Sequence, residues 1–176
     1  FPATGTTNPA DSSKPSFNET YSRFHHGAFA DWALSIEGRV SRPGSYSLAD
    51  LQKFPSRKQI TRHNCEEGWT AIAEWTGVPL STILQSAGIL PTARFVNFYS
   101  YDGYGDSIDM LDAFHPQTIL AYGMNGRALP VPHGAPLRLR VETQIGYKSL
   151  KYLERIVVSD EFVDMGDFGW AWYTGI

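Results

Sequence analysis

A hairpin near the middle of the chain constrains its fold more than any other stretch. An apolar run from Thr118 to Met124 has the length and composition of a buried strand. Asn125 and Gly126 follow it, and this pair is the strongest short-range signal for a hairpin with a type I′ turn. The next residues, Arg127 to Leu129, begin the return. The pattern therefore predicts a pair of antiparallel strands here.

Further strands and two short helices are predicted on either side of this hairpin. The first helix has Ser47 as its N-cap and ends at Pro55, and the second has Pro79 in its first turn and Gly88 at its end. Alternating or continuous apolar runs predict strands at residues 32–40, 58–61, 95–100, 137–141 and 156–158. Together these elements outline a chain of mixed α and β content.

Three segments between these elements are predicted as loops. Residues 17–27 mix aromatic and basic side chains without a clear period, which is typical of a loop that lines a site. Residues 101–108 are rich in Gly and Asp, which favours turns. Residues 144–153 combine glycine, hydroxyl groups and lysines. In the strand before the last loop, Arg138 and Arg140 share one side, a pattern that usually marks a solvated surface.

Length and charge limit the partners of the chain. Its 176 residues suit one domain, which we expect at 17–176, after a flexible lead-in at 1–16 that is rich in Thr, Ser, Pro and Asn. The 15 basic and 18 acidic residues give a net charge of −3, so no nucleic-acid partner is predicted. No run of 18 apolar residues predicts a membrane span.

Cys65 is the only cysteine of the sequence, so it cannot form an internal disulfide. Arg62 and His63 precede it, and Glu66 and Glu67 follow it. The remaining roles are a small buried apolar group, a reactive thiol, a metal ligand or an intermolecular link. Neighbouring positive charge lowers the pKa of a thiol, and a soft thiolate suits a thiophilic metal.

The stretch around Cys65 resembles the cysteine segment of the sulfite oxidase family of molybdopterin-dependent oxidoreductases, a family that includes bacterial sulfoxide reductases. That family has a His-x-Cys-x-Glu-x-Trp stretch followed by Trp-Thr-Gly-x-Pro-Leu. The matching residues here are His63, Cys65, Glu67, Trp69, Trp75, Thr76, Gly77, Pro79 and Leu80. The resemblance extends over residues 17–176 in five ordered segments. It implies that the Cys65 thiolate binds molybdenum and is the catalytic metal ligand.

The resemblance also implies a fold and an activity. The fold would be α+β, a single sulfite-oxidase-type molybdopterin-binding domain with mixed β-sheets and short helices around one cofactor pocket. The reaction would be oxygen-atom transfer on a small-molecule substrate, with molybdenum and molybdopterin as cofactors. No Cys-x-x-Cys-His motif for a covalent haem occurs, so electrons would pass to or from a separate carrier, a cytochrome or a membrane haem protein. Bacterial relatives are generally exported, which implies a periplasmic location. We expect a monomer, because the immunoglobulin-like dimerisation domain of sulfite oxidases is not in this sequence.

Individual site residues follow from the same resemblance. Arg23 and Tyr173 take the places of residues that face the substrate. Arg138 and Lys151 would supply two cations for the cofactor's phosphate. The residues expected to bind the cofactor are Asn18, Tyr21, His25, Cys65, Ser100, Asp102, His133, Arg138, Ser149, Leu150 and Lys151. Asn18 and Tyr21 follow the pattern of the sulfoxide reductases, whereas Arg23 and His25 follow that of the sulfite oxidases.

One departure from the family bears on the substrate. Sulfite oxidases have a second anion-binding arginine shortly after the cysteine, but Trp69 and Thr70 occupy that region here. We therefore expect a sulfoxide-like substrate to be favoured over sulfite. Two alternatives stay open: a non-catalytic module that binds a small anion, with Cys65 as a structural residue, and a zinc enzyme, although no His-x-x-x-His or paired-cysteine spacing supports zinc.

Overall fold

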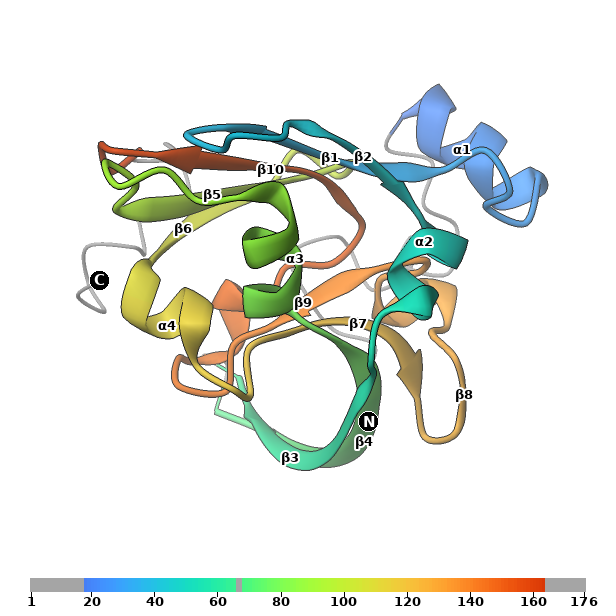
Figure 1. Ribbon diagram of the computed structural model, residues 1–176. Helices are drawn as coiled ribbons and strands as arrows, with labels where there is room; N and C mark the ends of the chain where they lie inside the picture. The colour runs from blue at the N-terminus through green and yellow to red at the C-terminus, as the bar shows by residue number, and fades with distance from the viewer. Residues whose placement is uncertain (1–17, 66–67, 164–176) are drawn as a thin grey trace.

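Two β-sheets form the framework of the computed structural model, which describes residues 18–65 and 68–163. In the first sheet the strand order is β2 (Gly44–Ser47), β1 (Ala33–Gly38), β10 (Leu153–Ser159), β5 (Phe95–Ser100) and β6 (Gly105–Asp109). In the second it is β3 (Arg57–Asn64), β4 (Thr70–Pro79), β7 (Ile119–Met124) and β8 (Arg127–Ala128), and β9 (Arg138–Arg140) also pairs with β7. Figure 1 shows the first sheet above the second.

The sheets are mixed, as expected. β1 and β10 pair in parallel, and the other strand pairs of the described residues are antiparallel. Short helices join the strands: α1 (Glu19–His26), α2 (Leu48–Lys53), α3 (Leu80–Ala87), α4 (Met110–Phe114), and the 3-10 turns η1 (Val131–His133) and η2 (Gly146–Lys148). The α+β prediction is confirmed.

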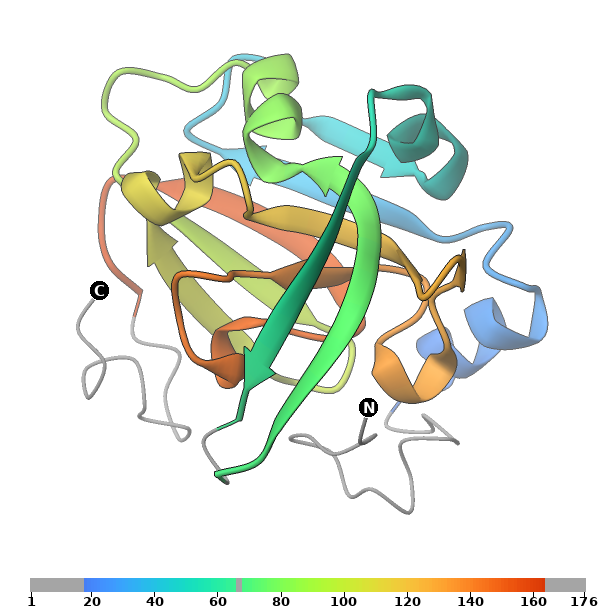
Figure 2. The ribbon, with the colours of Figure 1, turned by 90° about the horizontal axis from the view of Figure 1, so that it is seen from below.

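The main core lies between the two sheets. Leu34, Ile36 and Phe98 of the first sheet pack with Leu120 and Leu139 of the second, and the apolar side of α3 joins them. A smaller cluster, which includes Trp75, Ile119 and Ala121, lies on the opposite side of the second sheet. The second sheet is therefore buried on both sides around β7. The long β3–β4 ribbon of this second sheet lies in front of the other elements in Figure 2.

The structure confirms the predicted turn at Asn125 and Gly126, the N-cap at Ser47 and the helix end at Gly88. Asn125 and Gly126 adopt φ angles of 52° and 76° at the turn between β7 and β8, as a type I′ turn requires. Ser47 caps α2 in a capping box with Asp50. Gly88, with a φ of 76°, ends α3 in the left-handed conformation.

Three of the sequence predictions about local structure are wrong. Most of residues 17–27 form helix α1 rather than a loop, because Asn18 caps it, Glu19 lies in its first turn and basic side chains lie in its last turn. Half of residues 101–108 are not loop either, since β6 pairs with β5 from Gly105 onward. The predicted strand at 58–61 runs on to Asn64. Arg138 and Arg140 are buried, although two arginines on one side of a strand usually mark a solvated surface, because the side of β9 that bears them is covered by Trp75.

Candidate functional site

Cys65 lies in the turn that joins the two longest antiparallel strands of the described residues. It follows β3 directly, and its backbone N–H donates to the carbonyl of Trp69 at 3.0 Å. The N–H of Gly68 donates to the Cys65 carbonyl at 3.0 Å. The thiol-bearing residue is half-buried. A paired ribbon therefore presents Cys65 at its end, on a rigid element rather than on a long loop.

Three basic residues, His133, Arg138 and Lys151, form a group that we call the basic cradle. The Arg138 guanidinium donates to the carbonyl of His133 at 3.1 Å and to the carbonyl of Ser149 at 2.9 Å. Lys151 Nζ donates to the carbonyl of Pro132 at 3.1 Å. The loop that contains η1 and the loop that follows η2 are therefore joined through these two cations.

Gly134 allows the same two loops to approach closely. A Cβ atom at this position would lie 2.8 Å from Cβ of Lys151, and the residue has a φ of 109°. Both conditions favour glycine, since other residues rarely adopt this φ and none could fit without displacing Lys151. The spacing of the cradle thus depends on a residue without a side chain.

Burial and mutual repulsion perturb the basic cradle. Burial, with the nearby charge of Arg140, lowers the pKa of Arg138 to about 9. Burial and the charge of Arg138 lower the pKa of Lys151 to about 8. Burial and the charges of Arg138 and Lys151 lower the pKa of His133 to about 4, so its ring is neutral at pH 7. Within residues 18–65 and 68–163, neither Arg138 nor Lys151 forms a salt bridge. Such uncompensated buried charge favours the binding of an anion.

Two buried polar atoms at the cradle lack a hydrogen-bond partner in the described part of the chain. They are Nε of Arg138 and Oγ of Ser100. In the first sheet Ser100 pairs with Leu153, and Leu153 lies two residues after Lys151 in the chain. A buried polar group without a partner costs about 1 to 3 kcal/mol, so both atoms suit contact with a polar ligand. The site thus fits a group that carries phosphate and heterocyclic hydrogen-bonding atoms, as molybdopterin does.

The other predicted cofactor residues near the cradle brace it through contacts of their own. Asn18 accepts from the N–H of Tyr21 and donates to the carbonyl of Tyr101, both at 2.6 Å. The Tyr21 hydroxyl donates to the carbonyl of Ala135 at 2.5 Å, and its ring packs on that of Tyr152. Burial raises the pKa of Tyr21 above its ordinary value. These contacts hold α1 against the loops of the basic cradle.

Three more of the predicted cofactor residues act within their own loops. Asp102 accepts from the backbone N–H of Tyr104 at 3.2 Å. Ser149 accepts from the N–H of Val141 through its hydroxyl, and the carbonyl of buried Leu150 accepts from Leu139. Direct cofactor contacts by these residues stay a prediction.

The structure does not bring two of the predicted residues into the cradle. Arg23 and His25 lie on exposed positions of α1. The Arg23 guanidinium lies 5.5 Å from the ring centroid of Phe24, and the ring of His25 stacks on that of His26. Tyr173, the third residue predicted to be catalytic, lies outside the described residues. The roles of Arg23, His25 and Tyr173 therefore stay predictions.

A buried polar network that was not predicted from the sequence joins β3 and β9. Arg140 is 1% exposed and binds both Glu142 and His63. Burial and the charge of Arg140 lower the pKa of His63 to about 3. The indole of Trp75 lies 5.0 Å from the Arg138 guanidinium and 4.5 Å from that of Arg140. Arg140 ends β9 and Glu142 lies in the turn that follows, so opposite charges two residues apart could have revealed the pair.

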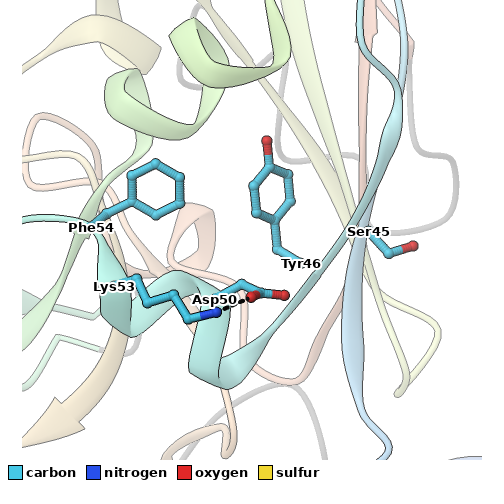
Figure 3. Close-up of a pocket in the computed structure, with 5 residues that line it drawn as sticks. All are labelled: Ser45, Tyr46, Asp50, Lys53 and Phe54. Atoms are coloured by element: carbon cyan, nitrogen blue, oxygen red, sulfur yellow. Dashed lines mark hydrogen bonds and ion pairs between the residues drawn. The ribbon is translucent and has the colours of Figure 1, made fainter.

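A hollow of about 390 Å³ beside α2 is separate from this site (Figure 3). Ser45, Tyr46, Asp50, Lys53 and Phe54 line it, and none of them is a predicted site residue. The rings of Tyr46 and Phe54 face the opening, Ser45 points away, and Lys53 pairs with Asp50 at 2.9 Å. The Lys53 side chain is largely exposed. The hollow has no buried charge to hold a cofactor.

The described residues were also searched for a metal-binding cluster of side chains and for a membrane-spanning helix. Among residues 18–65 and 68–163, no three His, Cys, Asp or Glu side chains converge on a point that could hold a metal ion. A metal at Cys65 would therefore need ligands from a bound cofactor or from residues 66–67 and the chain ends. In the same described part, no helix is both long enough and apolar enough to cross a membrane.

Comparisons with known proteins agree on one kind of domain. A family model described as the oxidoreductase molybdopterin binding domain matches residues 23–165. A putative protein-methionine-sulfoxide reductase subunit, YedZ1 of Azospira oryzae, is 39% identical over 148 residues, which cover 83% of this chain and 56% of that protein. The protein-methionine-sulfoxide reductase catalytic subunit MsrP of Ralstonia nicotianae is 34% identical over 149 residues, or 76% of this chain and 44% of that protein.

A solved structure has the same architecture. The sulfane dehydrogenase SoxCD from Paracoccus pantotrophus superposes with a TM-score of 0.71 and 28% sequence identity. The match covers 76% of this chain and 39% of that one. The chain spans about half the length of the curated relatives that it matches.

Proposed function

We propose that this chain carries the molybdenum-molybdopterin centre of an enzyme that performs oxygen-atom transfer on a sulfoxide-like or sulfite-like substrate. The chain belongs to the family of oxidoreductase molybdopterin-binding domains, and this membership supports the proposal. One observation carries this proposal. Buried Arg138 forms no salt bridge within the described residues, and its Nε has no hydrogen-bond partner there. Arg138 lies on β9 together with Arg140, and Arg140 contacts His63, the residue two positions before Cys65. A site for a large anion thus adjoins the only thiol of the chain.

The residues of the basic cradle would hold the organic part of the cofactor. Arg138 and Lys151 offer the phosphate a planar, multidentate donor and a point charge. Ser100 offers a hydroxyl to the pterin, and neutral His133 offers a ring nitrogen that either donates or accepts. The contacts of Asn18 and Tyr21 hold α1 over the loops that carry these groups. Cys65 supplies a thiolate to the metal.

When bound, the molybdenum centre supplies the oxo group and the two-electron redox change, as a cofactor does in enzymes of this kind. The protein's share is to orient the cofactor, supply the thiolate and limit the water around it. Trp69 contributes to the last task, because its ring packs on that of His63 beside the Cys65 turn.

The surroundings of Cys65 favour a weakly charged substrate. Sulfite carries a double charge and would need a second cation near the metal. The positions after the cysteine instead present the indole of Trp69, stacked on His63, and exposed Thr70. A sulfoxide needs only one or two hydrogen-bond donors, which Arg23 and Tyr173 are proposed to supply. Relatives named as methionine-sulfoxide reductases support this assignment.

The electron partner and the location are further parts of this proposal. Two curated relatives are named as subunits, one of them a catalytic subunit, which supports a separate electron carrier such as a cytochrome or a membrane haem protein. The family's habit of export supports a periplasmic location. We also propose that the chain itself acts as a monomer.

One preparation tests the proposal. The chain is expressed in a host that makes molybdenum cofactor, and metal analysis and pterin fluorescence after denaturation are measured on the purified protein. We expect both molybdenum and pterin to copurify. Absence of both would favour the anion-binding module. The same preparation, assayed in both directions, should reduce methyl sulfoxides with an artificial donor at least as well as it oxidises sulfite. Efficient sulfite oxidation without sulfoxide turnover would contradict the substrate assignment.

A further inference from the structure

A chain of buried polar contacts links β9 to the strand that precedes Cys65. Glu142 receives four hydrogen bonds: two from the Arg140 guanidinium, at 3.1 and 2.9 Å, and one each from Thr61 Oγ1 at 2.9 Å and Gln59 Nε2 at 3.2 Å. The third guanidinium nitrogen, Nη1 of Arg140, lies 2.6 Å from Nδ1 of His63. The side chains of Arg140 and Glu142 are 1% and 8% exposed. The contact is thus a desolvated ion pair with additional donors.

The three β3 residues in this network are alternate residues of one strand. Gln59, Thr61 and His63 all point to the inner side of the ribbon, because side chains alternate along a strand. Glu142 and Arg140 therefore bind the inner side of β3 from Gln59 to His63, which lies two residues before Cys65. The strand cannot slide or tilt without breaking several buried hydrogen bonds at once.

The direction of the last contact fixes the tautomer of His63. An arginine guanidinium can only donate, so Nδ1 of His63 accepts, and the proton of the neutral ring lies on Nε2. Nε2 faces the turn at η2, where a Cβ on Gly146 would lie 2.5 Å from it and 2.9 Å from the Asn64 carbonyl oxygen. His63 is therefore packed between Arg140 and Gly146, at the start of the loop that carries Ser149 and Lys151.

The other side of the His63 ring leads to the cysteine turn. Its centroid is 5.5 Å from that of Trp69, with the two ring planes inclined by 33°. Trp69 in turn accepts the backbone N–H of Cys65 through its carbonyl. A rotation of His63 would therefore move the residue that closes the Cys65 turn.

We propose that Arg140 and Glu142 are positioning residues that set the place of the Cys65 thiol relative to the basic cradle, with His63 as the intermediate contact. This proposal rests on the proposed function, in which the thiol and the cradle hold the same cofactor. Groups that orient a metal ligand from a distance commonly change metal affinity or activity about 10- to 100-fold when they are replaced. We expect that range for Arg140→Met and Glu142→Gln.

Two readouts separate positioning from mere stability. In the loaded enzyme, the electron paramagnetic resonance signal of the reduced metal reports the thiolate geometry. In cofactor-free protein, the alkylation rate of the sole cysteine reports its surroundings. Arg140→Met and Glu142→Gln should shift the signal and change the alkylation rate. Arg140→Lys should be intermediate, because a lysine can reach either Glu142 or His63 but cannot reproduce the fork.

Leu34→Ala is the matched control, since it removes buried contacts in the first sheet and lowers the melting temperature without touching this network. It should leave both readouts unchanged. If Arg140→Met fails to fold, Thr61→Val removes one donor to Glu142 at nearly constant shape and should give a smaller shift in the same direction. A wild-type signal and alkylation rate in the network variants, with a lower melting temperature, would make the pair purely structural and overturn the proposal. Wild-type protein without molybdenum and pterin would instead refute the proposed function.

Discussion

Arg138 and Arg140 allow a direct comparison of two buried cations on one strand. Both are almost fully buried, both lie over the ring of Trp75, and both lie on the same side of β9. Arg140 has a carboxylate partner in Glu142, whereas the hydrogen bonds of Arg138 within residues 18–65 and 68–163 go to the carbonyls of His133 and Ser149. We expect replacement by methionine to affect the cofactor-free protein very differently at the two positions.

The expected free energies follow from these contacts. The lowered pKa of Arg138, about 9, means that holding its charge in the folded protein costs roughly 5 kcal/mol. Its two hydrogen bonds return about 1.5 to 3 kcal/mol each. These opposing contributions nearly cancel, so Arg138→Met should change the free energy of unfolding by less than about 2 kcal/mol. Arg140→Met leaves the Glu142 carboxylate buried without its cation, which costs about 3 to 5 kcal/mol.

Thermal and chemical unfolding of cofactor-free protein, made in a host that lacks molybdenum cofactor synthesis, measures the difference. Arg140→Met should lower the melting temperature by roughly 10 °C, and Arg138→Met by a few degrees at most. In protein from a cofactor-producing host, pterin content should instead be lowered more by Arg138→Met than by Arg140→Met. Arg138→Met should then lose most of its pterin, because it removes a charge from the phosphate site.

Two outcomes would refute this reasoning. If Arg138→Met destabilised the cofactor-free protein as much as Arg140→Met, the charge of Arg138 would not be uncompensated. If Arg138→Met kept its full pterin content, the phosphate would bind elsewhere. Arg155→Met is a surface control, since Arg155 is about 40% exposed, pairs with half-exposed Glu37 and lies over the ring of Tyr99. It should change neither quantity by more than a small amount.

Three further predictions test other parts of the site and fold. Cys65→Ser should abolish turnover with little change in unfolding free energy, because serine is similar in shape but is a harder ligand; activity at matched pterin content would contradict the ligand assignment. The folded-state pKa of Lys151 lies below its ordinary value, at about 8, so the unfolded chain binds its proton more tightly. The stability of cofactor-free protein should therefore rise as the pH increases from about 8 to 10, and urea titrations should show a smaller rise in Lys151→Met. Gly77→Ala should cost more than about 4 kcal/mol, because its Cβ would overlap the Leu120 carbonyl oxygen and lie 2.7 Å from Cα of Ala121. Gly126→Ala, where the Cβ meets open space, should cost only about 1 to 2 kcal/mol.

Local signals predicted the elements that depend on local chemistry. The turn at Asn125 and Gly126, the capping box at Ser47 and the left-handed end of α3 at Gly88 each result from a few adjacent residues. Helix α1 was missed although Asn18 and Glu19 carried a cap signal. Its aromatic residues Tyr21 and Phe24 lie three residues apart, as on one side of a helix, but two positions are too few to establish a period. They pack on Tyr101 and Tyr152 from distant segments.

Long-range contacts explain what the sequence could not predict at the site. The burial of Arg138 and Arg140 depends on β4, which places Trp75 over both. Asp106 was interpreted as a turn residue, yet it is buried and binds Lys148 at 2.7 Å. Its partner is 42 residues away along the chain, and no period relates the two. Most candidate site residues were found through resemblance to the sulfite oxidase family rather than through pattern, because cofactor contacts are made by single residues on separate loops.

The balance of charge differs between the Cys65 half of the site and the basic cradle, and this difference determines which half attracts an anionic cofactor. In the half that holds Cys65, Arg140 and Glu142 neutralise each other and His63 is uncharged, so this half is stable without a ligand. In the basic cradle, burial lowers the pKa of both Arg138 and Lys151, and the charge of Arg138 lowers the pKa of Lys151 further. An anion between them removes that cost, whereas it gains nothing from the Cys65 half. Anion affinity therefore comes from the cradle, and the thiol is held ready by the neutral network beside it.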